Sequence, residues 1–157
     1  MNFNKFTIKS QEAVQKAIEI TRSSGSQAIE PVHLLKGVMT EGDSLVKFVF
    51  QKVGANITQL TVMIDKAISS LPKVSGGEPY FSRETNDVLQ KSLDVAKDNG
   101  DEYVTIEALL LALYLVKSQA STILKDLGLN EKDVRAAIEE LRKGKKATEQ
   151  SAEDTYN

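Results

Sequence analysis

Residues 104–116, VTIEALLLALYLV, decide how the rest of this 157-residue chain must fold. Only one charge, Glu107, interrupts the apolar residues of this stretch. A helix that crosses a membrane needs about 20 apolar residues, so the run is too short to be a membrane span. An apolar helix of this length in a soluble protein is buried on nearly every side. We therefore predict that it forms the centre of a helical core.

A weaker version of the same stretch occurs earlier in the chain, at residues 29–40, IEPVHLLKGVMT. The correspondence continues at a nearly constant offset, and the clearest pairs are Phe6 with Phe81, Thr7 with Ser82, Leu34 with Leu109, Gly25 with Gly100, Gly54 with Gly128 and Asn56 with Asn130. The chain therefore contains an internal duplication. Because a solenoid usually needs three or more units to bury its faces, two copies favour a closed pair related by a pseudo-two-fold axis.

Each copy divides into four apolar stripes with helical spacing. In the first copy, Thr7 is a plausible N-cap, Pro31 stands at the first position of a second helix, Gly54 ends the third and Asn56 caps the fourth. The second copy repeats this order. We therefore predict an all-α fold of eight helices, built as a tandem repeat of two four-helix units with pseudo-two-fold symmetry.

These patterns also set the expected domain boundaries. Residues 1–142 form one double-repeat domain, with repeat one at 6–71, a connector rich in proline and glycine at 72–80, and repeat two at 81–142. From residue 143 the sequence reads KGKKATEQSAEDTYN and the apolar period stops. We expect this part to be a polar linker or tail, disordered when alone, that leads to a domain outside the sequence.

The composition excludes several classes of function. A formal net charge of -2 and a pI near 5.5 provide no clustered basic surface for nucleic acid or an anionic membrane. The chain has no cysteine and one histidine, which excludes most metal sites and catalytic triads. No apolar leader follows the first methionine, so we expect a cytoplasmic protein. The modest charge and the absence of heptads favour a monomer for the isolated domain.

No group of residues composes an active site, so we expect a domain without enzymatic activity. Residues 37–44, GVMTEGDS, have the glycine spacing of a P-loop, but Asp43 occupies the position of the phosphate-binding lysine, so we interpret them as a turn between helices and not as a nucleotide site. His33 stands alone, and we expect it to make a structural hydrogen bond, with pH sensing as the alternative. Helix capping accounts for much of the acidic group Asp101, Glu102 and Glu107.

What remains is a surface for binding polypeptide. We expect a groove where the two copies meet, bordered by the starts of the first and fifth helices and by the loop before the central helix of copy two. An apolar groove between helices suits extended or amphipathic apolar segments. Leu89 lies near this expected groove, although for any single apolar residue an ordinary core position is the favoured interpretation.

Several motifs in the same order resemble the Clp amino-terminal domain family. They are Phe6-Thr7 with Ser10-Gln11 and Ala13, residues 29–31 with His33-Leu34-Leu35, Leu71-Pro72 before the connector, Phe81-Ser82, and Ile123-Leu124 with Leu127-Gly128. The resemblance covers residues 1 to about 142. It is stronger to the disaggregase branch than to the protease-coupled branch, which carries a glutamate where this chain has Val32.

This resemblance implies a substrate-binding and regulatory head of a hexameric AAA+ disaggregase, which captures unfolded or aggregated polypeptides. It implies no cofactor in this fragment, with ATP and Mg²⁺ in missing domains, a homohexamer for the full protein, and a possible partnership with a DnaK-type chaperone system. The positions that match residues linked to chaperone activity are Thr7, Asp101 and Glu107, and Leu89 matches an apolar groove position. Whether the first three act by contact or by helix capping stays open.

Two other functions are compatible with the sequence. The domain could dock folded adaptor proteins of a protease-coupled unfoldase through its helix surfaces. A small helical hydrolase that acts through His33 or the carboxylates is the other alternative, but the sequence supports no nucleophile, base and orienting group in proximity.

Overall fold

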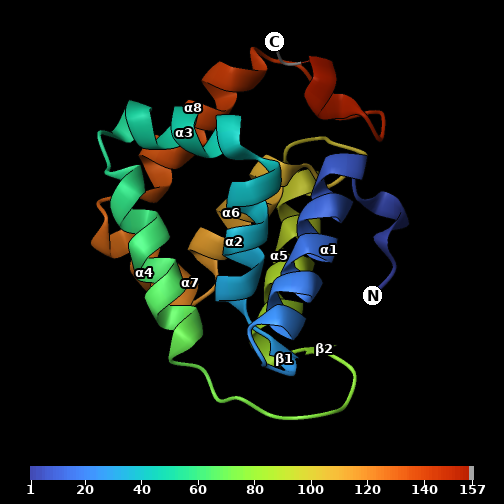
Figure 1. Cartoon of the computed structure of the whole chain (residues 1–157). Coiled ribbons are helices and arrows are strands. Elements are labelled where there is room, and N and C mark those ends of the chain that lie inside the picture. The colour runs from blue at the N-terminus through green and yellow to red at the C-terminus, as the bar shows by residue number, and fades with distance from the viewer. Residues whose placement is uncertain (156–157) are drawn as a thin grey trace.

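The computed structural model describes residues 1–155, and within them the fold is all-α (Figure 1). The eight helices are α1 (Ile8–Ser23), α2 (Pro31–Glu41), α3 (Asp43–Val53), α4 (Ile57–Ser69), α5 (Arg83–Asp98), α6 (Ile106–Leu115), α7 (Gln119–Asp126) and α8 (Glu131–Arg142). Two 3-10 turns, η1 (Phe3–Lys5) and η2 (Ala152–Thr155), and two short strands, β1 (Ala28–Ile29) and β2 (Tyr80–Phe81), complete the described chain. The predicted eight-helix fold is confirmed.

The helix boundaries repeat as the duplication predicts. Helices α1 and α5 have the same length of 16 residues, and each follows a hydroxyl cap, Thr7 or Ser82, whose side chain accepts a hydrogen bond from a backbone N–H of the first turn. Helices α4 and α8 both follow an asparagine cap, Asn56 or Asn130. Gly54 ends α3 in the left-handed conformation, with φ of 75°, as expected for a glycine C-cap.

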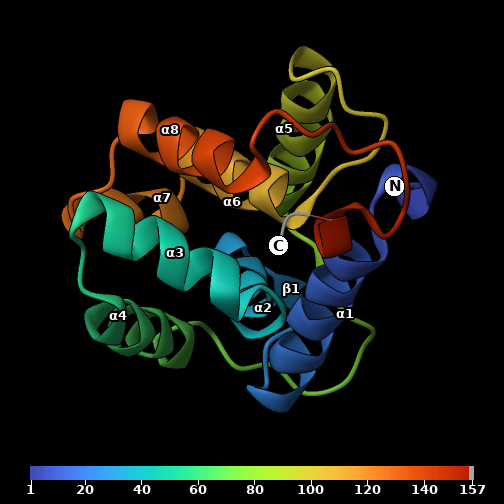
Figure 2. The same ribbon diagram turned by 90° about the horizontal axis from the view of Figure 1, so that it is seen from above.

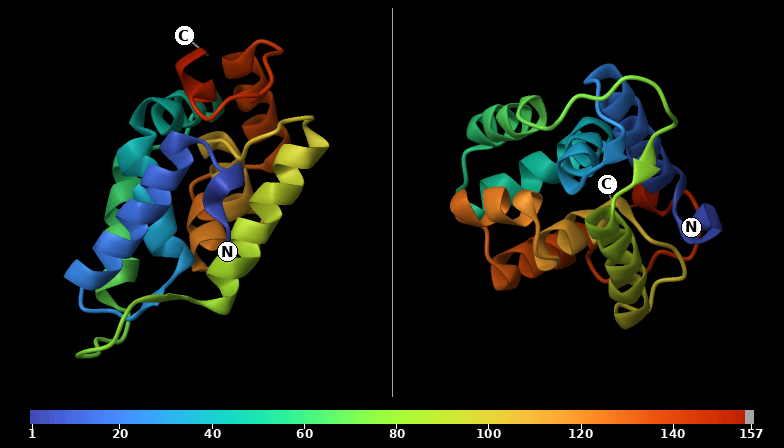
Figure 3. Two further views of the ribbon diagram at one scale, coloured as in Figure 1. Left: turned by 90° about the vertical axis from the view of Figure 1, so that its right-hand side faces the viewer. Right: turned by 90° about the horizontal axis from the view of Figure 1, so that it is seen from below.

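The two copies exchange backbone hydrogen bonds reciprocally. Phe6, just before α1, pairs with Val104, just before α6, in an isolated parallel bridge. In the mirrored position, Phe81 of β2 pairs with Ile29 of β1, just before α2. The segment before the first helix of each copy thus pairs with the segment before the second helix of the other copy, as a pseudo-two-fold axis predicts. Figure 3 shows the chain from two further sides.

The second helix of each copy is central, as predicted. Eight residues of α6 are buried, and α6 contacts α1, α2, α5, α7 and α8. Helix α2 packs closely on α1 because Gly37 has no side chain. A Cβ at this position would overlap the carbonyl oxygen of Ala13 in α1.

The C-terminal residues differ from the expectation of a disordered tail. Residues 143–155, here called the tail, leave the end of α8 and cross the top of the molecule to the start of α1 (Figures 1 and 2). The side chains of Ala147 and Ala152 are buried against the domain. The sequence pattern did not predict an ordered tail. Hydrogen bonds to the backbone and two small side chains hold the tail, and these leave no apolar period in the sequence.

Among residues 1–155, no single helix is long and apolar enough to cross a membrane. Helices α6 and α7 would reach the required length only together, and they meet at a bend of 92°.

Candidate functional site

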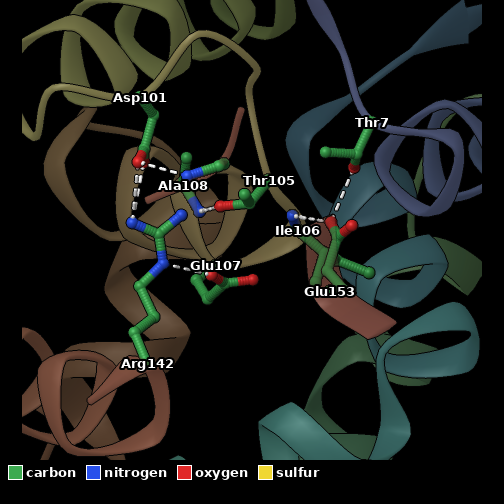
Figure 4. Close-up of polar contacts among 9 residues, drawn as sticks. Thr7, Asp101, Thr105, Ile106, Glu107, Ala108, Arg142 and Glu153 are labelled. Carbon is green, nitrogen blue, oxygen red and sulfur yellow. Dashed lines mark hydrogen bonds and ion pairs between the residues drawn. The ribbon is translucent and has the colours of Figure 1, made fainter. Parts of the chain in front are cut away.

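Arg142, the last residue of α8, joins two of the candidate site residues (Figure 4). Its Nε atom donates to Oε2 of Glu107, in the first turn of α6, over 2.9 Å. Its Nη1 atom lies 2.8 Å from Oδ2 and 3.0 Å from Oδ1 of Asp101, in the loop that precedes α6. The side chains of Arg142, Asp101 and Glu107 are only 5%, 1% and 2% exposed. The site is therefore a buried carboxylate–guanidinium–carboxylate network.

The ionisation of Glu107 is shifted mainly by its burial. Burial raises the pKa of the Glu107 carboxyl above its ordinary value, and Arg142 opposes that shift. The negative charge of Glu153 in the tail raises the pKa of Glu107 further, although by less than burial does. One oxygen of Glu107, Oε1, is buried and has no hydrogen-bond partner within the described chain. Burial is thus the main reason why the charged form of Glu107 is disfavoured.

Thr7 performs the capping role that the sequence predicted, and it also binds the tail. Its Oγ1 accepts a hydrogen bond from the N–H of Ser10 in the first turn of α1, over 3.1 Å. The same hydroxyl donates to Oε2 of Glu153 over 2.6 Å. That oxygen also accepts from the backbone N–H of Ile106, the first residue of α6, over 3.0 Å (Figure 4). One tail carboxylate therefore joins the starts of α1 and α6.

Neither of the other two acidic candidates is an N-cap residue. The N-cap of α6 is Thr105, whose hydroxyl accepts from the N–H of Ala108, and Glu107 instead binds Arg142. Asp101 lies in a loop, where Oδ1 accepts from Arg142 and from the backbone N–H of Ala147 in the tail. Thr7 and Asp101 contact the tail directly, whereas Glu107 contacts the arginine from which the tail departs.

Leu89 is not an accessible groove residue. It lies in the middle of α5, is 0% exposed and belongs to the hydrophobic core. Its helix turns that face toward α6, so a bound polypeptide has no access to the side chain while the fold is intact. The expectation of a groove contact at Leu89 is therefore corrected to a core position.

A cleft of about 410 Å³ does lie between the repeats, but its borders differ from those expected. Apolar and charged side chains of both repeats line it, and they include Lys9, Asp43, Leu45, Phe48, Ile106, Leu141 and the candidate site residue Glu107. The start of α1 borders this cleft, whereas the start of α5 lies at the opposite end of the molecule (Figure 1). The reason is the reciprocal strand pairing, which places the start of α1 beside α6 and the start of α5 beside α2.

His33 has the structural role that the sequence favoured. Its Nδ1 atom accepts a hydrogen bond from the N–H of Glu30, the N-cap of α2, over 2.9 Å. Burial lowers the pKa of this histidine to about 4, so the ring is neutral at physiological pH. The P-loop-like residues form the end of α2 and the turn at Gly42 into α3, as expected.

The sequence analysis missed Arg142 and Glu153. A signal for Arg142 was present, because it continues the buried stripe of α8 after Ile138 and corresponds to Ile68 in the first copy. An isolated acid such as Glu107 in an apolar helix also requires a buried cation. No comparable signal pointed to Glu153. Over residues 1–155, no three His, Cys, Asp or Glu side chains gather in a way that could hold a metal ion.

Comparison with known proteins places this chain in a family. Residues 5–127 match the family model described as the Clp repeat (R) N-terminal domain. The chain belongs to this family. Its Clp N-terminal domain is 60% identical, over 99% of the chain, to the chaperone protein ClpB of Bacteroides thetaiotaomicron, and 54% identical, over the whole chain, to that of Porphyromonas gingivalis. The chain spans 18% of the length of each of these relatives.

A solved structure shows the same fold. The crystal structure of the Hsp104 N-terminal domain from Candida albicans matches 96% of this Clp N-terminal domain and 99% of its own chain, with a TM-score of 0.85 at 19% identity. At that identity, the match establishes the shared fold alone.

Proposed function

We propose that this domain is a non-catalytic head that binds apolar segments of unfolded or aggregated polypeptides and delivers them to an ATP-driven hexamer. The observation that carries the proposal is the cleft between the repeats, whose lining combines apolar side chains such as Leu45, Phe48 and Leu141 with charged ones. Such a surface binds an extended chain by burying apolar side chains, while its charged side chains stay solvated. The similarity to two chaperone proteins named ClpB supports the same function.

The affinity of one head is expected to be weak. The cleft is open and small compared with a standard protein interface, so apolar burial offsets only part of the entropy lost on binding. Six heads around one ring would compensate through effective concentration. The hexamer, the ATP and Mg²⁺ in later domains, the cytoplasmic location and cooperation with a DnaK-type chaperone are parts of this proposal, because the chain covers only 18% of its relatives.

Titration with an unfolded model polypeptide, reduced and carboxymethylated α-lactalbumin, tests the proposal. Chemical-shift changes should concentrate at the cleft, and Phe48→Asp should weaken binding at least several-fold, because Phe48 is partly exposed in the cleft lining. Val62→Asp is the matched control, since Val62 on α4 is 62% exposed and lies outside the cleft. Equal affinity of the two variants would remove the cleft from the function. Shifts confined to outer helix surfaces would favour adaptor docking.

A further inference from the structure

The tail is bound to the domain residue by residue, in the manner of a peptide ligand. Oδ1 of Asp101 accepts from the backbone N–H of Ala147 over 2.9 Å. The carbonyl oxygen of Ala147 accepts from the N–H groups of Glu102 and Tyr103, over 2.8 and 3.2 Å. Further along, the carbonyl oxygen of Gln150 accepts from the N–H of Ile8 over 2.8 Å. Contacts to the backbone of an extended segment are how proteins bind peptides with little dependence on sequence.

Three tail side chains add specificity to these backbone contacts. Ala147 is 0% exposed and Ala152 is 3% exposed, so larger side chains would not fit without moving the tail. Glu153 follows directly and places its carboxylate between the hydroxyl of Thr7 and the N–H of Ile106. The bound pattern is a small residue, four residues of any kind, and then a second small residue followed by an acid.

The position that receives the acid is electrostatically suited to it. Ile8 and Ile106 are the first residues of α1 and α6, and the first N–H groups of a helix lack partners inside it. Two helix N-termini therefore point their partial positive charge at one place, where the tail supplies a carbonyl oxygen and a carboxylate. The buried hydroxyl of Thr7 adds a third donor.

The equivalent position at the other end of the pseudo-two-fold axis is not a carboxylate site. There, the residue that corresponds to Ile106 is Pro31, which begins α2 and has no N–H to donate. The positions that correspond to Glu107 and Arg142 are Val32 and Ile68, both buried and apolar. The donors and the ionic network thus occur together at one end only, the end where the tail binds.

We propose that this surface, formed by Thr7, Ile8, Ile106 and residues 101–103, is a peptide-binding site whose built-in ligand is the tail. An external polypeptide segment with small residues and a carboxylate in the same pattern displaces the tail and occupies the site. Glu153 and Asp154 also line the cleft between the repeats, so a client that enters the cleft meets the tail. This inference rests on the proposed function and adds to it the chemistry of the preferred segment.

Displacement is feasible because, among residues 143–154, only the small side chains of Ala147 and Ala152 are buried. A tethered segment acts at an effective concentration of about millimolar, which a multivalent client can exceed. Arg142 is the positioning residue of the site, because it fixes Asp101 and starts the tail from the end of α8. Thr7 and Asp101 then affect activity through the tail, whereas Glu107 both binds Arg142 and lines the cleft that a client enters.

A released variant, Ala147→Trp with Glu153→Lys, tests the site in the full 157-residue chain. The tryptophan cannot enter the closed Ala147 position and the lysine opposes two helix N-termini, so the tail should detach. Hydrogen exchange at the amides of Ile8, Glu102 and Ile106 should accelerate at least tenfold. Glu149→Lys is the charge-matched control, because Glu149 is exposed, and exchange there should remain unchanged. Unchanged exchange in the released variant overturns the proposal.

Two additions to the released variant complete the test. A synthetic peptide of residues 145–155, KKATEQSAEDT, should restore slow exchange at Ile106 at millimolar concentration, and the same peptide with Glu153→Lys should not. Carboxymethylated α-lactalbumin should bind the released variant at least threefold more tightly than the unmodified chain. Equal binding to both overturns the competition and leaves the proposed function standing, whereas no binding to either removes the proposed function itself.

Discussion

Arg142 at the end of α8 and Glu107 at the start of α6 form a buried ion pair, with Nε and Oε2 separated by 2.9 Å. Since Arg142 also holds Asp101, replacing it leaves two buried carboxylates without their cation. We expect Arg142→Met to lower the free energy of unfolding by about 3 to 5 kcal/mol in urea titrations. Adding Asp101→Asn and Glu107→Gln to this variant should restore part of the loss. A loss below about 1 kcal/mol for the single change would contradict a tightly buried network.

The raised pKa of Glu107 predicts a pH-dependent contribution to stability. Because the folded state raises this pKa above the ordinary 4.5, folding favours the protonated carboxyl. The stabilising contribution is complete below about pH 4.5 and is lost as the pH rises through the folded-state pKa. As the pH rises through that range, the unmodified chain should therefore lose unfolding free energy relative to Glu107→Gln. Equal pH profiles for the two proteins would contradict the raised pKa.

His33 predicts a pH dependence of the opposite sign. Burial lowers its pKa from 6.5 to about 4, so the neutral ring stabilises the fold fully above pH 6.5 and this contribution is lost as the pH falls to about 4. Thermal melts should show the loss in the unmodified chain. In His33→Gln, whose amide oxygen can still accept from the N–H of Glu30, this part of the pH dependence should be absent.

Leu89 tests the difference between a core residue and a contact residue. Since it is fully buried, Leu89→Ser should cost about 3 to 5 kcal/mol of unfolding free energy and lower the melting temperature. Phe48→Asp in the cleft should instead reduce polypeptide binding and leave the melting temperature within a few degrees. If Leu89→Ser melted normally and lost binding, the core assignment of Leu89 would be wrong.

The fold could be predicted from sequence because its determinants are local. Caps at Thr7, Asn56 and Asn130 and the left-handed Gly54 are each specified within one turn of helix, and the duplication supplies every signal twice. The candidate site depended on contacts between distant residues. The carboxylate of Glu153 meets Thr7 across almost the whole chain, and no local pattern encodes such a contact.

The three polar residues that the resemblance selected lie close together in the structure. Thr7, Asp101 and Glu107 all lie where α1, α6 and α8 approach one another, although none was predicted to bind the tail or Arg142. The prediction of a groove contact at Leu89 was wrong. The period of an amphipathic helix identifies its buried face but does not indicate whether a neighbouring helix or a ligand covers that face.

The reciprocal pairing of Phe6 with Val104 and of Phe81 with Ile29 has a consequence for how the halves depend on each other. The two repeats therefore resemble the subunits of a dimer, and the connector at residues 72–80 links them covalently. Two fragments produced by cleavage in the connector should therefore reassociate by complementation. A connector that is too short should instead favour a domain-swapped dimer, in which each chain pairs its repeats with those of the other chain.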